Sequence, residues 1–283
     1  FLLWEAHSSH PMLDVNFFRN PRFSAASSAI MMVFFAMFGS TFLITQYFQF
    51  VRGYGPLSAG VHLLPVALSV GAGSVAGTQL AVRAGTKLVV TSGLIAMAAF
   101  YAWAAMTATA TLSYGVIAIQ MVLYGLGMGL TSAPATESIM GAVSRRMAGV
   151  GSAVNDSTRL VGGTLGVAVI GSVFASVYAS RLTATLPAGL PGRAALAARQ
   201  SVGGAYAAAG DVAAHGSPAL GHALRLAADQ AFLHGLTIGS LVAGGVAAAG
   251  AVLAVIFLPA QPARLSDSVP SEPVRHPATV TRP

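Results

Sequence analysis

Charged residues are scarce and cysteine is absent in this sequence of 283 residues. Without cysteine the chain has no disulfide, no thiolate nucleophile and no Cys-ligated metal. Only 8% of the residues are Asp, Glu, Lys or Arg, whereas soluble globular proteins carry about 25%. Because so few charges do not cover the surface of a chain of this length, the composition excludes an ordinary soluble domain.

Long runs without any charge identify the solvent that surrounds the chain. They are residues 23–51, 53–82, 88–136, 160–180 and 230–263. A helix needs roughly 20 apolar residues to cross a bilayer core, and the third run is long enough for two crossings. With 55% hydrophobic residues and a mean hydropathy of +0.71, these runs predict an integral membrane protein with six spans.

The predicted fold is an all-α membrane protein, a bundle of six transmembrane helices. The expected spans are residues 23–51, 56–81, 88–106, 113–133, 148–179 and 231–258. We expect residues 1–22 to form a cytoplasmic lead-in that is polar from residue 5 onward. Residues 180–229 are expected to form an extracytoplasmic loop, and the Pro-rich residues 260–283 a disordered cytoplasmic tail. Ala-rich stretches at 191–202 and 219–230 predict short helices inside the loop.

Basic residues in the short loops predict the orientation. With the lead-in in the cytoplasm, Arg83, Lys87, Arg145 and Arg146 share its side. Most basic residues of the other side fall in 180–229, a long loop in which the positive-inside rule weakens. We therefore expect a multi-pass protein of the cell (plasma) membrane with both termini of this chain in the cytoplasm.

Several function classes find no support in the sequence. The net charge of +7 comes from 15 scattered basic residues, without the cluster that nucleic-acid binding requires, so no nucleic-acid partner is expected. No G-x-x-x-x-G-K-[ST], G-x-S-x-G or H-E-x-x-H occurs. We expect no enzyme, no cofactor and no metal site.

Glycines recur four residues apart in four predicted spans. The pairs are Gly73 and Gly77, Gly125 and Gly129, Gly162 and Gly166, and Gly235 and Gly239. Small residues at this spacing let helix backbones approach closely in lipid, which predicts a tight bundle. The alternative is chance, because the chain contains 32 glycines.

A stretch of the chain resembles a known family. The segments "PMLDVNFFRNPRF", "LITQYFQFVRGYGPLSAGVHLLPVAL" and "YGLGMGLTSAPATESIMGAVSRRMAGVGSAVNDSTRLVGGTLGVAVIGSVF" carry the likeness, which extends over residues 8–258. The chain resembles the C-terminal half of a major facilitator superfamily transporter. It is most similar to the fourteen-helix drug:proton antiporter (multidrug efflux) group.

This resemblance implies a function and a set of partners. It implies efflux of apolar or cationic small molecules by alternating access, driven by protons. The implied partners are a small-molecule substrate, protons, the lipid bilayer and an N-terminal helical half that this chain lacks, so we expect a fragment. Two alternatives stay open: an exporter of a lipid or native metabolite on the same fold, and a non-transporting truncated membrane scaffold.

The resemblance also implies a loop motif of the family in "GTQLAVRAGTK". Arg83, Gly85 and Lys87 fit it, whereas Val82 stands where the motif has Asp. The acid–base clamp usual at this site is therefore in question.

Polar residues precede the apolar part of the fifth predicted span. In a helix, Asn155 and Arg159 share one stripe, and Asp156 lies one turn from Arg159, within pairing distance. Pairing would lower the cost of an Arg in the membrane, which is about 3 kcal/mol on insertion scales. We favour a role as a gate lock, in which these residues hold the cytoplasmic mouth of the transporter shut in one state. The other functional interpretation is a proton-sensitive pair, in which protonation of Asp156 frees Arg159. Alternatively, Arg159 only anchors the helix by extending to the headgroups.

Three residues are candidates for contact with substrate. Gln46 lies near the end of the first span among aromatic residues, and Gln120 and Tyr124 lie one turn apart in the fourth. Polar side chains inside a span usually face the protein interior or an aqueous path. The alternative for Gln46 is a place in the aromatic belt at the outer interface.

Two residues of the second span affect its mechanics and its chemistry. His62 is either a proton carrier or a residue hydrogen-bonded to a neighbour at the outer end of the span. Pro65 predicts a kink in the same helix.

Overall fold

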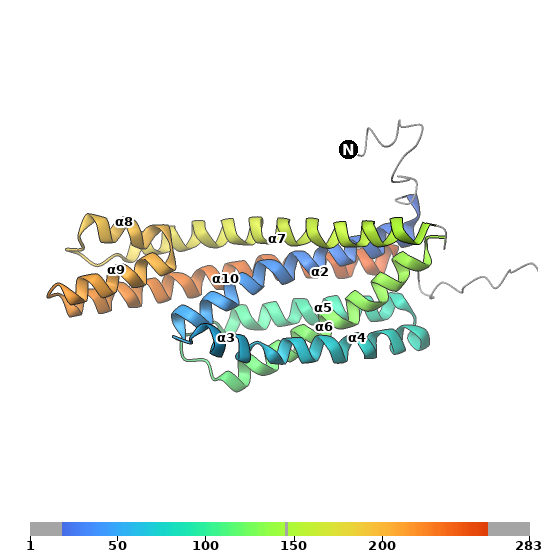
Figure 1. Cartoon of the computed structure of the whole chain (residues 1–283), viewed down its shortest axis with the longest axis horizontal. Helices are drawn as coiled ribbons and strands as arrows, with labels where there is room; N and C mark the ends of the chain where they lie inside the picture. The colour runs from blue at the N-terminus through green and yellow to red at the C-terminus, as the bar shows by residue number, and fades with distance from the viewer. Residues whose placement is uncertain (1–18, 145–146, 260–283) are drawn as a thin grey trace, which may run out of the picture.

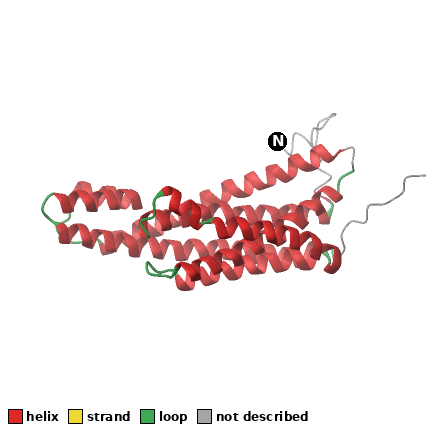
Figure 2. Cartoon of the chain, turned by 60° about the horizontal axis from the view of Figure 1, so that its bottom comes forward, coloured by secondary structure: helices red, strands yellow, loops and turns green. Residues whose placement is uncertain are grey.

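The computed structural model describes residues 19–144 and 147–259, and every regular element in these ranges is a helix (Figures 1 and 2). The elements are α2 (Pro21–Gln46), η2 (Tyr47–Val51), α3 (Pro56–His62), α4 (Leu64–Ala84), α5 (Thr86–Thr107), α6 (Tyr114–Gly141), α7 (Ala148–Thr185), α8 (Gly192–Gln200), α9 (Val202–Ala214) and α10 (Pro218–Phe257). Most of the predicted lead-in and the whole predicted tail lie outside the described residues.

Six stretches of helix are long and apolar enough to cross a membrane. They are Pro21–Val51, Pro56–Ala84, Thr86–Thr107, Tyr114–Gly141, Ala148–Thr185 and Pro218–Phe257. The outer surface is apolar as well, with Leu68 73% and Leu160 69% exposed. The predicted six-helix membrane bundle is confirmed, and the chain is a multi-pass membrane protein.

The helices lie nearly parallel in one elongated bundle. The helix α2 packs along α7, α4 packs along α6, and α5 lies between α6 and α10. The first residues of α2 and the last residues of α10 lie at the same end of the bundle (Figure 1), as an even number of crossings requires.

Glycines make the closest helix contacts, as their spacing predicts. A Cβ on Gly166 or Gly162 of α7 would collide with the carbonyl oxygens of Phe35 or Met31 on α2. A Cβ on Gly73 of α4 would lie 2.8 Å from the carbonyl oxygen of Leu126 on α6. No side chain separates these backbones, so the helices make close van der Waals contact. Such contact stabilises helix association in lipid, where the hydrophobic effect does not drive it.

The second span is interrupted at Leu63, which confirms the expected effect of Pro65. The first segment ends at His62, and α4 begins at Leu64. Because proline has no N–H, Pro65 donates no helical hydrogen bond to Val61, and its ring crowds that carbonyl. The N–H of Leu63 bonds instead to the carbonyl oxygen of Gly60 at 3.1 Å.

The segment predicted as the loop 180–229 is largely helical. The helix α7 runs to Thr185, and α10 begins at Pro218, so the predicted helix at 219–230 forms the first turns of α10. At 1.5 Å per residue, these helices of 38 and 40 residues are about 57 and 60 Å long, whereas the bilayer core measures about 30 Å. The predicted helices were too short because bilayer thickness was taken as the limit of helix length. An Ala-rich sequence continues a helix beyond the lipid.

Two short helices cover the projecting part of α7 and α10. The predicted helix at 191–202 corresponds to α8, whereas α9 was not predicted. The two helices pack on each other, and α9 packs along α10 (Figure 1).

A cavity between α2, α4, α5, α6 and α10

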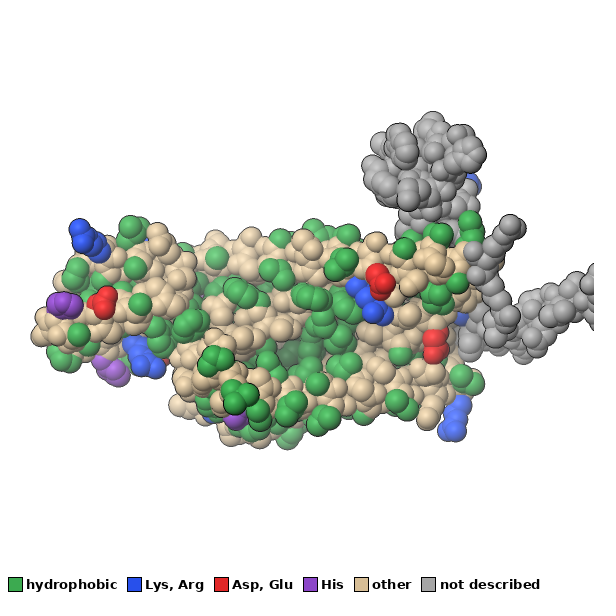
Figure 3. Space-filling model, in the orientation of Figure 1, with side chains coloured by type: hydrophobic (Ala, Val, Ile, Leu, Met, Phe, Trp, Pro, Cys, Tyr) green, Lys and Arg blue, Asp and Glu red, His purple; other side chains and the backbone are tan. Residues whose placement is uncertain are grey.

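A cavity of about 260 Å³ opens midway along the bundle. The surface is hollowed there and surrounded by hydrophobic side chains (Figure 3). Its lining residues come from α2, α4, α5, α6, α10 and the α5–α6 connection: Ser40, Thr41, Ile44, Tyr47, Leu63, Val66, Ala67, Phe100, Tyr101, Ala104, Ala108, Thr109, Leu112, Ile117, Gln120, Met121, Tyr124, Leu236 and Ser240. The lining contains no Asp, Glu, Lys, Arg or His.

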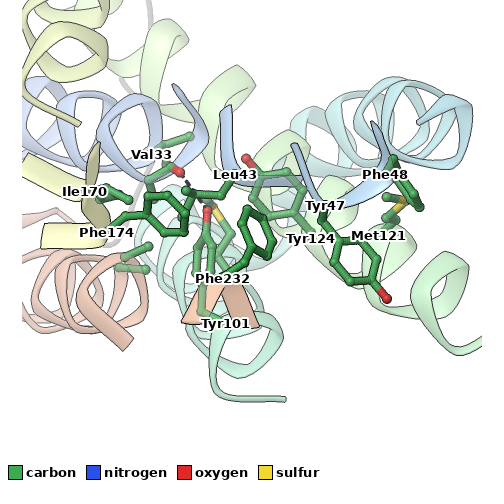
Figure 4. Packing of buried hydrophobic residues seen from close by; sticks show 14 of the residues in the cluster. Val33, Leu43, Tyr47, Phe48, Tyr101, Met121, Tyr124, Ile170, Phe174 and Phe232 are labelled. Carbon is green, nitrogen blue, oxygen red and sulfur yellow. Dashed lines mark hydrogen bonds between the residues drawn. The ribbon is translucent and has the colours of Figure 1, made fainter. Parts of the chain in front are cut away.

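Three aromatic rings form one wall of the cavity. The ring centroid of Phe100 lies 4.8 Å from that of Tyr101 and 4.8 Å from that of Tyr124. Tyr101 and Tyr124 meet edge to face at 5.8 Å and belong to the buried core drawn in Figure 4. Packed rings of this kind present a rigid apolar surface to a ligand.

The polar groups of the cavity include hydroxyls of α2 and α5 and an amide of α6. The hydroxyl of Tyr101 donates to the carbonyl oxygen of Ala36 at 2.8 Å and lies 2.9 Å from the hydroxyl of Ser40. The amide nitrogen of Gln120 donates to the hydroxyl of Thr107 at 2.8 Å.

Two of the three predicted substrate contacts line this cavity. Gln120 and Tyr124 are buried and lie on its wall. Gln46 is half-buried and is absent from the lining. Its neighbour Ile44 lines the cavity, and two residues along a helix turn the side chain by about 200°.

One side of the cavity is bounded by η2 and the α5–α6 connection, which hydrogen bonds join. The hydroxyl of Tyr47 donates to the carbonyl oxygen of Thr109 at 2.9 Å. Arg52 donates to the carbonyl oxygens of Ala110 and Leu112 at 3.2 and 2.8 Å. These bonds join η2 and Arg52, which follows it, to the α5–α6 connection. The sequence did not predict that η2 is a π-helical turn.

Arg159 contacts α6 and α2 instead of Asp156. Its Nη2 donates to the hydroxyl of Thr136 at 3.0 Å, and its guanidinium carbon lies 5.1 Å from the ring centroid of Phe34. Among the described residues, Arg159 makes no ion pair with Asp156, which is exposed. The expected contact is not formed because the partly buried guanidinium finds a hydroxyl and a π face on neighbouring helices.

Asn155 lies on the buried side of the same helix. It is 5% exposed, and its Oδ1 has no hydrogen-bond partner. The Nε of Arg159 is also buried without a partner. The two residues thus bring unpaired polar atoms to the first turns of α7, near the start of α2.

His62 is enclosed by aromatic rings near the break in the second span. Its Nδ1 lies 2.7 Å from the carbonyl oxygen of Ser58, so this nitrogen carries the hydrogen. The ring centroids of Tyr54 and Tyr114 lie 4.4 and 4.6 Å from that of His62. This arrangement favours the alternative in which His62 is bonded to a neighbour.

Comparison with known proteins identifies the family. The profile of the Major Facilitator Superfamily matches residues 5–167, more than half of the chain. The chain belongs to the Major Facilitator Superfamily. Its membership confirms the resemblance that the sequence segments carry and indicates a transporter rather than an enzyme.

Curated relatives in this superfamily have names that refer to drug resistance or efflux. The chain is 29% identical over 267 residues to the tetracenomycin C resistance and export protein of Streptomyces glaucescens, covering 93% of this chain and 49% of the relative. It is 29% identical over 257 residues to the multidrug efflux pump LfrA of Mycolicibacterium smegmatis, with coverages of 91% and 50%. It is 33% identical over 175 residues to the multidrug resistance protein Stp of Mycobacterium tuberculosis, with coverages of 62% and 32%. The chain spans at most about half the length of these relatives.

The residues predicted to form the loop motif lie where α4 meets α5, with Arg83 in the last turn of α4 and Lys87 in the first turn of α5. Gly85 has a φ of 90°, which ends α4 and starts α5 in a conformation that L-residues rarely adopt. Arg83 is exposed, Lys87 is half-buried, and Val82 is 72% exposed. Arg83, Gly85 and Lys87 therefore form a turn at the bundle end opposite to α8 and α9 (Figure 1).

Sequence reasoning missed Ser40, Phe100, Tyr101 and Ser240 as residues of the cavity. These residues lie on three different spans, and no spacing along the sequence links them. A search for hydroxyl and aromatic residues near the middle of each predicted span would have selected Ser40 and Tyr101.

Within the described residues, no group of three or more His, Asp or Glu is arranged to hold a metal ion.

Proposed function

We propose that this chain is the C-terminal six-helix domain of a proton-coupled efflux transporter. The whole protein exports apolar or cationic small molecules by alternating access, with this bundle rocking against an N-terminal helical half. It resides in the plasma membrane, with both termini of this chain in the cytoplasm. The superfamily, the names of the relatives and their roughly doubled length support this proposal.

The cavity is the observation that carries the proposal. It combines a wall of three aromatic rings with a few hydroxyl and amide groups, and it lies between helices that are long and apolar enough to cross the bilayer. Small-molecule sites are predominantly apolar, with few polar groups that set orientation. A scaffold protein without a transported ligand has no use for such a hollow between tightly packed helices.

In this proposal Asn155 and Arg159 contribute to the cytoplasmic gate, whereas the exposed Asp156 does not. Arg159 joins α7 to α6 through Thr136 and to α2 through Phe34. A single side chain that holds three helices together at one end of a bundle locks that end until its contacts break. The turn at Arg83, Gly85 and Lys87 lies at the same end and limits the separation of α4 and α5.

Proton coupling requires a test in the full natural polypeptide. Inverted membrane vesicles are prepared from a bacterial host that lacks its major drug pumps. A pH gradient with an acidic vesicle interior is imposed, and uptake of ethidium is followed by fluorescence. We expect uptake that a protonophore abolishes. The substitution Gln120→Ala reduces uptake several-fold, because it removes a polar group from the cavity wall.

Ile119→Ala is the matched control, because Ile119 precedes Gln120 on α6 but is 60% exposed and does not line the cavity. Ethidium uptake that is unchanged by the protonophore contradicts proton coupling. Equal loss in the two variants contradicts a substrate role for the cavity. Absence of transport of ethidium and of labelled phospholipid alike favours the scaffold.

A further inference from the structure

Gln120 of α6 is held in one orientation by Thr107 of α5. The hydroxyl of Thr107 donates to the carbonyl oxygen of Trp103 at 2.8 Å, and this bond uses its single hydrogen. The same hydroxyl oxygen lies 2.8 Å from the amide nitrogen of Gln120, so it accepts a hydrogen bond from that nitrogen. The amide nitrogen of Gln120 therefore faces Thr107, and the amide oxygen faces away from it.

The amide oxygen of Gln120 is left without a donor. Among the described residues, Oε1 of Gln120 makes no hydrogen bond, and it does not belong to the unpaired side-chain atoms that are fully covered. The whole side chain is only 4% exposed and lines the cavity. Because an enclosed polar atom without a partner is costly, a ligand in the cavity that donates a hydrogen bond to this oxygen gains affinity.

Hydroxyl hydrogens of the lining are used within the protein. Those of Thr41 and Tyr47 bond to backbone carbonyl oxygens at 2.7 and 2.9 Å. Those of Ser40 and Tyr101 are directed to the carbonyl oxygen of Ala36 or to each other. A ligand that accepts hydrogen bonds finds none of these four hydrogens available, whereas a ligand that donates one finds the unpaired amide oxygen of α6.

The aromatic wall favours a positive charge on the same ligand. The rings of Phe100, Tyr101 and Tyr124 pack together at the cavity, and the faces of aromatic rings are negative. A cation over such faces is attracted without a counter-ion. Because no lining residue carries a positive charge, nothing in the lining repels it. A flat aromatic cation matches both the shape and the electrostatics of this wall.

We propose that the cavity recognises flat aromatic cations that carry an amino group, and that an N–H of this group donates to the amide oxygen of Gln120. This inference rests on the proposed function and narrows its substrate class to hydrogen-bond donors. Gln120 is the specificity-determining residue. Thr107 does not line the cavity and is a positioning residue, because its hydroxyl fixes which end of the amide meets the ligand.

Ethidium and 5-ethyl-6-phenylphenanthridinium form a matched pair of probes, since they share the ring frame and the positive charge and differ in two amino groups. Binding of each to the full natural polypeptide in lipid nanodiscs is measured by isothermal titration calorimetry. We expect ethidium to bind about threefold to tenfold more tightly, the gain expected from one hydrogen bond. Gln120→Met removes this preference and leaves the affinity for the probe without amino groups within about twofold.

Ile119→Met is the matched control, because it places the same side chain on the neighbouring residue, which is 60% exposed and does not line the cavity. It keeps the preference for ethidium. Thr107→Val and Thr107→Ser test the positioning role. Valine has the shape of threonine but no hydroxyl, so it releases the amide of Gln120 and lowers the preference. Serine retains the hydroxyl and the preference.

The outcomes separate this inference from the proposed function. Equal binding of the two probes by the unmodified protein, or a preference that survives Gln120→Met, overturns the inference, while proton-driven uptake of ethidium in vesicles leaves the proposed function intact. A preference that is unchanged in Thr107→Val, or lost in Thr107→Ser, overturns the positioning role. Failure of both probes to bind overturns the inference, and absence of proton-driven uptake overturns the proposed function as well.

Discussion

The guanidinium of Arg159 on α7 donates to the hydroxyl of Thr136 on α6 at 3.0 Å and leaves Asp156, one turn away on its own helix, unpaired. The π face of Phe34 on α2 covers the same guanidinium at 5.1 Å. Arg159 thus contacts two neighbouring helices rather than a residue of its own helix, so a motion of the bundle would change its contacts.

Arg159→Lys is expected to lower transport by the full natural polypeptide about tenfold. A lysine ammonium is a compact, strongly hydrated ion that does not reproduce the planar contact with Phe34 while bonding to Thr136. Asp156→Asn is expected to leave transport within about twofold, because Asp156 is exposed. Ethidium uptake in vesicles measures both. Rescue of transport in the double reversal Asp156→Arg with Arg159→Asp contradicts this view and restores the pair that the sequence predicted.

Gly166→Ala is expected to lower the free energy of unfolding by about 1–3 kcal/mol, the usual cost of overpacking. The added Cβ collides with the carbonyl oxygen of Phe35 on α2, a backbone atom that moves only with its helix. Gly171→Ala is the control on the same helix, because its Cβ meets no atom within 4 Å. That change is expected to stabilise α7 slightly. The midpoint of thermal unfolding in detergent is measured for both variants. Equal shifts of the midpoint in the two variants argue against close packing of α2 and α7.

Tyr206→Phe is expected to loosen α9 from α10. The hydroxyl of Tyr206 donates to Oδ1 of Asp229, and the guanidinium carbon of Arg225 lies 4.7 Å from the Tyr206 ring centroid. Amide hydrogen exchange in α9 should increase by about tenfold, since hydrogen bonds to charged groups contribute about 1.5–3 kcal/mol. Asp211→Asn, on an exposed side chain of α9, should change nothing. Unchanged exchange in Tyr206→Phe indicates that apolar contacts alone hold α9.

The same tyrosine predicts a pH dependence. Burial, followed by the hydrogen bond to Asp229 and its charge, raises the pKa of Tyr206 above the usual 10.0. Because the folded state holds this proton more tightly, the contribution of Tyr206 to stability is fully present below pH 10.0. It is lost as the pH rises through the folded-state pKa. Tyrosinate absorbance of the wild type minus that of Tyr206→Phe should therefore show a titration above 10.0. A titration at or below that value contradicts the contact.

His62→Gln is expected to leave proton-driven transport within about threefold. The Nδ1 hydrogen of His62 already bonds to Ser58, and the ring lies between Tyr54 and Tyr114. The substitution should lower the thermal midpoint, since it removes ring contacts. Loss of the response to a pH gradient, with unfolding unchanged, identifies His62 as a proton carrier instead.

The sequence predicted the spans and the break at Pro65 because both follow from local properties. Hydrocarbon excludes charge, so runs without Asp, Glu, Lys or Arg reveal a crossing, and a missing N–H interrupts a helix wherever it occurs. The ends of α7 and α10 were predicted less well. Bilayer thickness limits the apolar run but not the helix, which continues through Thr185 and begins at Pro218 because Ala-rich segments stay helical beyond the lipid.

The cavity could be predicted only in part. Gln120 and Tyr124 were selected because polar residues inside a span face protein or water, and they line it. Gln46 was selected by the same argument, yet it lies outside the lining. Which face of a span meets its neighbours depends on helix rotation, and the even hydrophobicity of membrane helices leaves little periodic signal to set it.

By itself, the sequence determined that six apolar segments become helices in lipid and that glycines let them approach, because these outcomes depend on the energy of each segment in its solvent. Only the tertiary structure decided that Ser40, Tyr101 and Tyr124 surround one hollow, and that Arg159 bonds to Thr136 rather than to Asp156. Those contacts join helices far apart in the chain, and the packing of backbones at the glycines sets which side chains meet.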